Sequence, residues 1–328
     1  MTALSPVSAQ GEQVADGRLL WRRLAAVTLR QHKASLAAYA ACALLLAVAM
    51  AVTGLILHQS RTDVFSVGPH SLWPLYNRTG TALRLILPLT PVLAGLFFGA
   101  PMVAREIETG TARFAWAQCA GRTRWLLASV VPVALILMAI GAGLGLEFSW
   151  WLRSPGSPEP FFSDRLFTLN PLPLPGWTVL GLSVGVLLGA AIRRTVPAMA
   201  ATLACGLPAM YATLTWQRGY LSPLRQAAAH PVFSSGGGYG YSVPLTSRAG
   251  QRPAILSSAL GWPDGRLLSS TQLHHTAAWF RAHHIQIWLT YQPSSRYFLF
   301  QGIEFGWLVL ASALLIGATL LALRRGAS

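Results

Sequence analysis

Long apolar runs separated by short polar segments dominate the amino-acid sequence. Six of these runs predict membrane-spanning helices, at residues 34–57, 85–103, 126–151, 177–192, 197–216 and 303–323. A helix needs about 20 predominantly apolar residues to cross roughly 30 Å of hydrocarbon, and most of the runs approach or exceed that length. They are spread along the chain, so a cleaved N-terminal signal does not explain them. The pattern predicts an all-α polytopic membrane protein with six transmembrane helices.

The composition agrees with this prediction. Hydrophobic residues make up 53% of the 328 residues and charged residues only 11%, and the mean hydropathy is +0.47. Soluble domains carry roughly a quarter charged residues. Pro88, Pro91 and Pro101 interrupt the second apolar run. Membrane helices tolerate such prolines where neighbouring helices satisfy the freed carbonyls, so we expect them to be static kinks.

Basic residues determine the predicted orientation. Several precede the first run, namely Arg18, Arg22, Arg23, Arg30 and Lys33, and Arg324 and Arg325 follow the last. Because arginine and lysine favour the cytoplasmic ends of membrane helices, both termini are expected in the cytoplasm. Residues 17–35 carry Leu20, Leu24 and Val27 on one stripe and predict an amphipathic helix in the membrane interface. The alternative is an inner extension of the first span.

The predicted organisation has four parts. Residues 1–33 form the N-terminal cytoplasmic segment, 34–216 hold five transmembrane helices, and 303–328 hold the sixth helix with a basic tail. Between them, residues 217–302 are rich in Gly, Pro, Ser and His and predict a small extracytoplasmic α+β domain. Ser270 or Thr271 is a candidate helix cap there, and residues 285–291 alternate as a strand does.

Charge and motifs exclude several classes of function. The net charge is +15, but no nucleic-acid recognition motif accompanies it, so membrane lipids are the expected partner and nucleic acid is not. Lys33 is the only lysine, so no Gly-x-x-x-x-Gly-Lys phosphate loop exists. No hydrolase motif is present, and His274-His275 and His283-His284 do not have a usual zinc spacing. We expect no catalytic residue, metal or cofactor, and no structural disulfide, with Cys42 and Cys205 as buried free thiols in spans.

A dense charged turn lies between the second and third runs. Arg105, Glu106 and Glu108 end the second run, and Gly110 permits the left-handed conformation that commonly closes a helix. Ile107 and Thr111 can face one way, which leaves Glu106, Glu108 and Arg113 for a partner or for one another. The alternative is a solvated inner loop that only obeys the charge rule for orientation.

The residues of this turn carry a family resemblance. Arg105-Glu106-Ile107-Glu108-Thr109-Gly110-Thr111 resembles the Arg-Glu-x-Glu-x-Gly-Thr signature of type 2 ATP-binding cassette exporter permeases, which follows the second of six spans. Residues 30–33 and 291–296 are similar to segments of an actinobacterial branch of these permeases.

The resemblance implies a function for the turn. Arg105, Glu106, Glu108, Gly110, Thr111 and Arg113 would couple the chain to a separate nucleotide-binding ATPase subunit, which binds the ATP. It also implies a second permease copy, in a homodimer or heterodimer, and a bacterial cell membrane. The apolar spans suggest an amphipathic or hydrophobic substrate. The loop between residues 217 and 285 has no motif that identifies a cargo.

Two acidic residues lie near the predicted outer ends of spans. Glu147 and Glu304 are close enough to the outer interface to reach water, and an ionisable residue in apolar surroundings is a candidate gate or substrate contact. They also support a rival function, a proton-coupled secondary transporter. A second rival is a non-transporting membrane sensor whose outer domain binds a ligand.

Overall fold

The computed structural model describes residues 21, 23–59, 72–112, 116, 121–153, 167–216, 221–233, 239–242, 254–269, 271–272, 275 and 277–325. The chain divides into a helical unit, Met1–Ser157 with Thr168–Thr213 and Gly302–Ser328, and a sheet unit, Pro158–Phe167 with Leu214–Gln301. Arg113, Cys119 and His274 lie outside the described residues.

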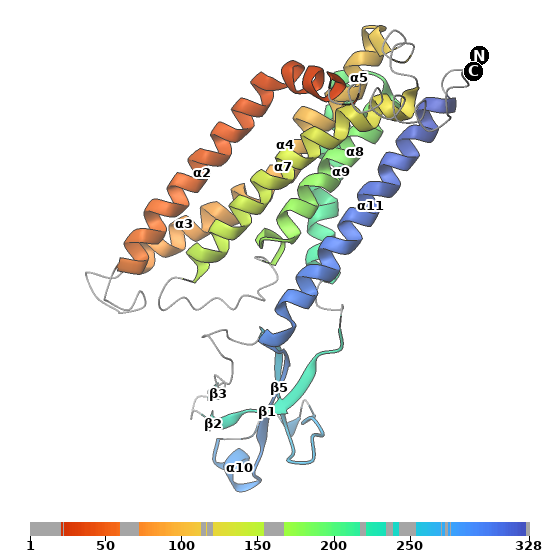
Figure 1. The fold of residues 1–328 in the computed structure, drawn as a ribbon. Helices are drawn as coiled ribbons and strands as arrows, with labels where there is room; N and C mark the ends of the chain where they lie inside the picture. Colours follow the sequence, from red (N-terminus) through yellow and green to blue (C-terminus); the bar gives the residue numbers. More distant parts are fainter. Residues whose placement is uncertain are drawn as a thin grey trace, which may run out of the picture. The chain divides into compact units, whose positions relative to one another are not determined.

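The helical unit is built from long apolar helices (Figure 1). Its elements are α2 Lys33–Gln59, α3 Trp73–Ile86, α4 Leu89–Ala94, the π-helical segment η1 Gly95–Gly99, α5 Ala100–Glu108, α7 Arg122–Leu152, α8 Pro173–Ile192, α9 Thr195–Trp216 and α11 Tyr297–Arg325. Among the residues that the structure describes, five helical stretches are long and apolar enough to cross a membrane: Lys33–Gln59, Trp73–Glu108, Arg122–Leu152, Pro173–Ile192 and Tyr297–Arg325.

The remaining predicted span, 197–216, falls on α9. Its described apolar part, Thr195–Met210, is shorter than the five candidate spans. The helical class and five of the predicted spans are therefore confirmed as apolar helices, whereas the count of six and the orientation stay predictions. The N-terminal helical residues 23–31 run directly into α2, because backbone bonds join His32 to Thr28 and Leu36 to His32. The helical backbone is therefore continuous there, while the interfacial position of residues 17–35 and the alternative of an inner extension both stay predictions.

The second predicted span is interrupted at one of its three prolines. Pro88 stands between α3 and α4, whereas Pro91 lies inside α4 and Pro101 lies in the first turn of α5, which continues from η1 without a gap. The amide of Ala100 donates to the carbonyl of Gly95, which is the i to i+5 bond of a π-helix. The sequence predicted interruptions at all three prolines and did not predict the π-helical turn.

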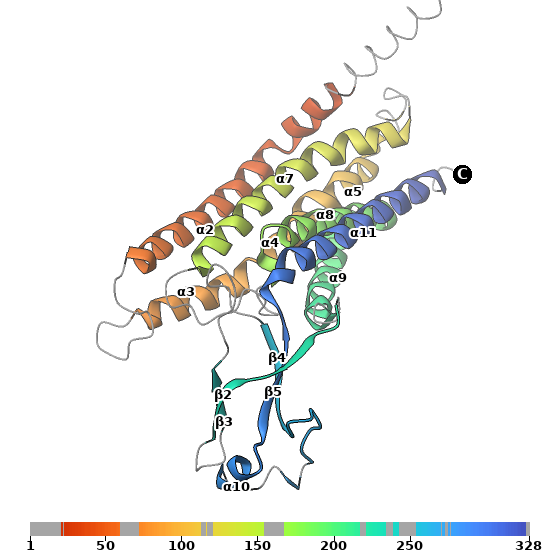
Figure 2. The same cartoon turned by 60° about the horizontal axis from the view of Figure 1, so that its bottom comes forward.

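α8 is the central helix of this unit. It contacts α4, η1, α5 and α7 (Figures 1 and 2). Gly181, Gly185 and Gly189 lie four residues apart, on the face of α8 that meets the broken second span. A Cβ at Gly181 would collide with the carbonyl of Pro91, one at Gly185 with that of Gly95, and one at Gly189 with that of Ala100. Small residues at this spacing allow two backbones to approach closely.

Larger side chains pack around these glycines and form the core of the helical unit. Phe98, Leu126, Val133, Leu182 and Val186 are buried together. Near the C-terminal ends of α2 and α7, the ring of Trp151 stacks on Tyr76, and its indole N–H donates to Thr53 Oγ1 at 3.2 Å. The faces of α2 and α11 that point away from this core are exposed and apolar, as helix faces that meet lipid are.

In its described residues the sheet unit contains two antiparallel sheets, a short α-helix and a 3-10 turn at Ser294–Arg296. Strands β1 Leu224–Ala227, β5 Gln286–Gln292 and β4 Ala254–Gly261 form one sheet in that order, and β2 Ala229–Phe233 pairs with β3 Tyr239–Ser242. The core includes Leu260, Phe280 of α10 Ala277–Ala282, Ile287 and Leu289. The alternation predicted for residues 285–291 is confirmed as far as Leu289, because Ile285, Ile287 and Leu289 are buried, whereas Tyr291 is half-buried and Gln292 is buried instead. The predicted helix is shorter at its start, since Thr271 lies in a turn.

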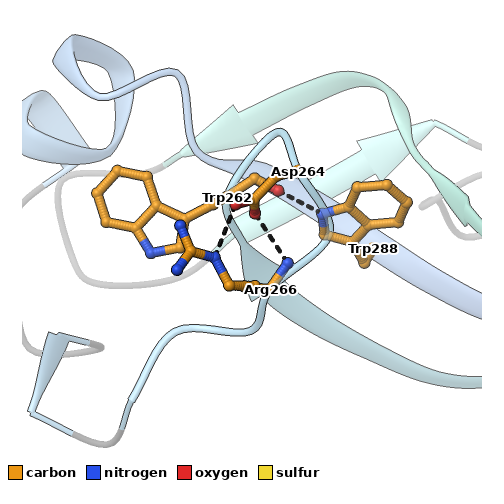
Figure 3. A network of polar contacts seen from close by, with 4 residues as sticks. All are labelled: Trp262, Asp264, Arg266 and Trp288. Atoms are coloured by element: carbon orange, nitrogen blue, oxygen red, sulfur yellow. Dashed lines mark hydrogen bonds and ion pairs between the residues drawn. The ribbon is translucent and has the colours of Figure 1, made fainter.

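A tight turn after β4 is held by side chains (Figure 3). Asp264 accepts bonds from the backbone N–H of Arg266 at 3.0 Å and from its Nε at 2.7 Å. These two bonds, the backbone bond first, hold the pKa of Asp264 below its ordinary value. Trp288 Nε1 donates to the carbonyl of Trp262 at 3.0 Å, which fastens the turn to β5.

The glycine contacts of α8 predict that two glycine-to-alanine substitutions differ in their effect on the stability of the fold. Gly185→Ala places a methyl group against the Gly95 carbonyl and should destabilise the protein by about 1–3 kcal/mol. Gly143→Ala is the control, because nothing lies within 4 Å of a Cβ there and alanine favours the helix. Thermal unfolding of the detergent-purified protein measures both. Equal midpoints for the two variants would contradict the close packing.

Candidate functional site

The charged turn begins where α5 ends. The amide of Thr109 donates to the carbonyl of Arg105 at 2.9 Å, and that of Gly110 donates to Ile107 at 3.1 Å. Gly110 has φ +76°, so the predicted left-handed closure is confirmed. A Cβ at Gly110 would meet no atom within 4 Å, which means that the backbone conformation, and not space, favours glycine here.

Glu106 is bound within the turn. Thr111 Oγ1 donates to Glu106 Oε2 at 2.5 Å, and the Thr109 and Thr111 hydroxyls lie 2.9 Å apart. Thr109 and Thr111 are exposed and Glu106 is half-buried. The two threonines therefore hold one acidic side chain in a defined position at the surface of the turn.

Glu108 is bound to a different helix. Its Oε2 accepts the backbone N–H of Thr195 at 3.0 Å and the Thr195 hydroxyl at 2.7 Å. Thr195 begins α9, whose first N–H groups lack partners within the helix. The preceding helix, α8, ends at Arg193 in the left-handed conformation with φ 60°. Glu108 thus connects the end of the broken second span to the start of α9.

Sequence reasoning missed this connection. It assigned Glu106 and Glu108 to a partner or to each other, whereas both carboxylates have threonine partners in the chain. A weak signal was present, because Thr195 follows two arginines and precedes Pro197 near a helix start, where threonine is a favoured residue. The position of Glu108 beside it depends on the fold.

The start of α7 is bound to the end of α11. Arg122 Nη1 donates to the carbonyls of Leu323 at 2.8 Å and Arg324 at 3.3 Å, which are among the last in that helix. Its guanidinium also lies 4.8 Å from the centre of the Trp116 ring. A cation satisfies such terminal carbonyls and complements the negative end of the helix dipole.

A cavity of about 570 Å³ lies beside the turn. Thr28, His32, Met102, Arg105, Trp125 and Ser129 are among the residues that line it. Burial, and then the positive charge of Arg105, hold the pKa of His32 below its ordinary value, while Glu106 acts in the opposite direction. The sequence singled out Arg105 for a partner but did not connect it with His32.

Glu304 lies in a different environment from the one expected. Its side chain is 0% exposed, so it does not reach water as its place near the outer interface suggested. Trp177 Nε1 of α8 donates to Glu304 Oε1 of α11 at 2.9 Å, and the Trp307 ring packs edge-on against Trp177. Glu147 is half-buried on α7. The structure therefore makes Glu304 a link between two helices.

Cysteines and histidines form no evident metal centre in the described ranges. No group of three or more His, Cys, Asp or Glu side chains there is placed to hold a metal ion. Cys42 and Cys205 are free thiols on exposed faces of apolar helices, not buried as expected. Lipid-facing positions accept a cysteine as a small apolar residue.

The long apolar helices are those of an integral membrane protein, and the charged turn lies at the end of one of its candidate spans. The chain belongs to the ABC-2 membrane transporter related family, whose sequence profile matches residues 34–218, more than half of its length. Comparisons with curated proteins and with solved structures gave no match. Members of this family are typically the non-catalytic permease component, and the family implies an ATPase partner in general.

The Glu304 link predicts a stability difference between two variants. Glu304→Ala leaves the buried Trp177 N–H without this acceptor and should cost about 1–3 kcal/mol. Glu304→Gln keeps a side-chain oxygen that can accept the bond, so its cost should be smaller. Thermal unfolding midpoints compare the two, and an equal loss in both would contradict a structural role for the hydrogen bond.

His32 predicts a pH dependence of stability. Its pKa is lowered by folding, so the unfolded chain, with a histidine pKa of about 6.5, binds the proton more tightly. The stability associated with neutral His32 is present above that pH and is lost as the pH falls towards the lower folded pKa. The midpoint temperature of unfolding should therefore decrease as the pH is lowered below about 6.5. The decrease should be smaller in His32→Gln. His283→Gln, at an exposed histidine of the sheet unit, is the control.

Proposed function

We propose that this chain is the permease subunit of an ATP-binding cassette exporter, and that a separate ATPase subunit docks on the turn at residues 105–113. One observation supports this most strongly. Glu108, at the end of α5, binds the start of α9, and Arg122, at the start of α7, binds the end of α11. A force applied to the turn would therefore reach α9 through Glu108, and a force on the start of α7 would reach α11 through Arg122.

Close packing makes the transmission direct. α5 continues from η1, and both pack against α8 with backbone contacts at Gly185 and Gly189. Because a packed interface of this kind resists continuous deformation, a displacement of the turn moves α5 and α8 together. In this proposal ATP binding by the partner tilts these helices between two access states.

The proposed cargo and assembly follow from the apolar surfaces. Leu45 of α2 and Leu314 of α11 are 72% and 67% exposed in the single chain. Such faces meet lipid or a second permease copy, in a homodimer or a heterodimer. A pathway lined by apolar helices suits an amphipathic or hydrophobic substrate, moved across a bacterial cell membrane.

The buried carboxylate of Glu304 supports a second candidate, a proton-coupled transporter. The two candidates differ in their energy source. Transport by the reconstituted chain that is driven by a proton gradient without any ATPase, and that is abolished in Glu304→Gln, would favour the second candidate. Transport that needs the ATPase and ATP would exclude it.

The docking proposal is tested by a double variant. Glu106→Ala with Glu108→Ala should reduce binding of an identified stand-alone nucleotide-binding subunit by about tenfold, because both carboxylates lie at the surface of the turn. Co-purification and ATPase-driven transport in proteoliposomes are the measurements. Normal recruitment and normal transport in the double variant would contradict the assignment.

A matched control separates docking from transmission. Thr195→Val removes the hydroxyl that binds Glu108 but leaves both carboxylates in place. If the turn is the docking surface, Thr195→Val should retain the ATPase subunit while lowering the transport obtained per ATP hydrolysed. Loss of recruitment in Thr195→Val would show that the carboxylates act through the position of α9.

A further inference from the structure

The cavity beside the charged turn has two chemically different parts. Its deeper part is made of buried side chains: Met102, Trp125 and Ser129 are 4%, 7% and 7% exposed. Its rim carries Arg105, which is exposed, and Val27, which is 52% exposed. An occupant would therefore meet apolar surface inside and charge at the entrance.

Two hydroxyls inside the cavity are already engaged. Thr28 Oγ1 donates to the carbonyl of Leu24 at 3.1 Å, and Ser129 Oγ donates to that of Trp125 at 2.9 Å. The lining also offers the half-buried ring of His32 and, at the rim, the guanidinium of Arg105, which is the cation among these groups. Arginine recognises phosphate through two parallel N–H bonds, which favours a phosphate-containing head at the rim.

The charge around the rim favours an anion. Glu106 is the one acidic residue in the lining, and it is held by Thr111. Arg23 and Arg30 are exposed and lie four residues before and three after Val27, so they flank the rim on the same helix. Together with Arg105 they outnumber the acidic side chain.

The depth of the cavity favours a lipid over a soluble protein. Met102 and Arg105 belong to the candidate span Trp73–Glu108, and Trp125 and Ser129 belong to Arg122–Leu152. The inner wall of the cavity is thus formed by the ends of membrane helices, and Thr109 and Thr111 of the turn complete its lining. We propose that it binds the headgroup of an anionic phospholipid, with the phosphate on Arg105 and the glycerol and first methylenes against Met102 and Trp125.

Native mass spectrometry of the detergent-purified chain tests this proposal without the ATPase subunit, so its outcome does not depend on the proposed function. The probes are dioleoyl phosphatidylglycerol and dioleoyl phosphatidylcholine. The protein should retain phosphatidylglycerol in preference, and Arg105→Ala should weaken that retention by about tenfold, as expected for a lost charge-assisted bond. Arg105→Lys should restore part of it.

Two controls identify the site. Arg124→Ala removes an exposed cation near the start of α7 that does not line the cavity, and it should retain the lipid. Thr28→Phe fills the cavity and leaves Arg105 in place, so it should lose the lipid as well. Elution volume and thermal midpoint show that each variant is folded. Equal loss in Arg105→Ala and Arg124→Ala would overturn the proposal in favour of diffuse surface charge.

A soluble competitor separates the two sources of phosphate. Glycerol 3-phosphate lacks the acyl chains and should not displace phosphatidylglycerol at millimolar concentration, because the apolar wall contributes to binding. Displacement by glycerol 3-phosphate would overturn the lipid assignment and indicate a site for free phosphate esters. No retained lipid, together with an effect of Arg105→Ala on ATPase recruitment alone, would assign the cavity to the partner protein.

Discussion

The backbone contact between α8 and the broken second span is the constraint on which the helical unit depends. The carbonyls of Pro91, Gly95 and Ala100 lie where side chains on α8 would otherwise stand, and Gly181, Gly185 and Gly189 leave the space for them. In an apolar solvent helices gain little from burying apolar surface, so close packing of this kind contributes much of the association. The contact holds η1 and α5 against α8, and the charged turn follows directly from the end of α5.

From that position the turn reaches other helices through a few polar contacts. Glu108 satisfies the start of α9, and Arg122 satisfies the last carbonyls of α11. Each contact joins a charge to the helix end of complementary polarity, which is favourable even at an exposed site. Residues that the sequence presents as a cluster of charge are thus, in the structure, the connections between separate helices. Through these connections a movement of the turn can be passed to the helices, as the proposed function requires. The family to which the chain belongs is related to ABC-2 membrane transporters, which agrees with that proposal.

Local features were predictable because they depend on neighbouring residues. The apolar runs, the interruption at Pro88 and the closure at Gly110 follow from composition and backbone geometry. The partner of Glu108 was not predictable, because Thr195 is 87 residues away and no periodicity relates the two. The burial of Glu304 was missed for the same reason, since its position in the sequence suggested an outer interface, whereas Trp177 of a different helix covers it.

The sequence by itself determined the class of the protein, the membrane helices and the residues of the charged turn, because hydrophobicity, proline and glycine act on the chain locally. Only the tertiary structure decided which groups the charges bind. It placed His32 and Arg105 around one cavity, Glu106 on Thr111 and Glu108 on α9. Those pairings are set by the close approach of helices, and that approach depends on the shapes of surfaces that are far apart in the sequence.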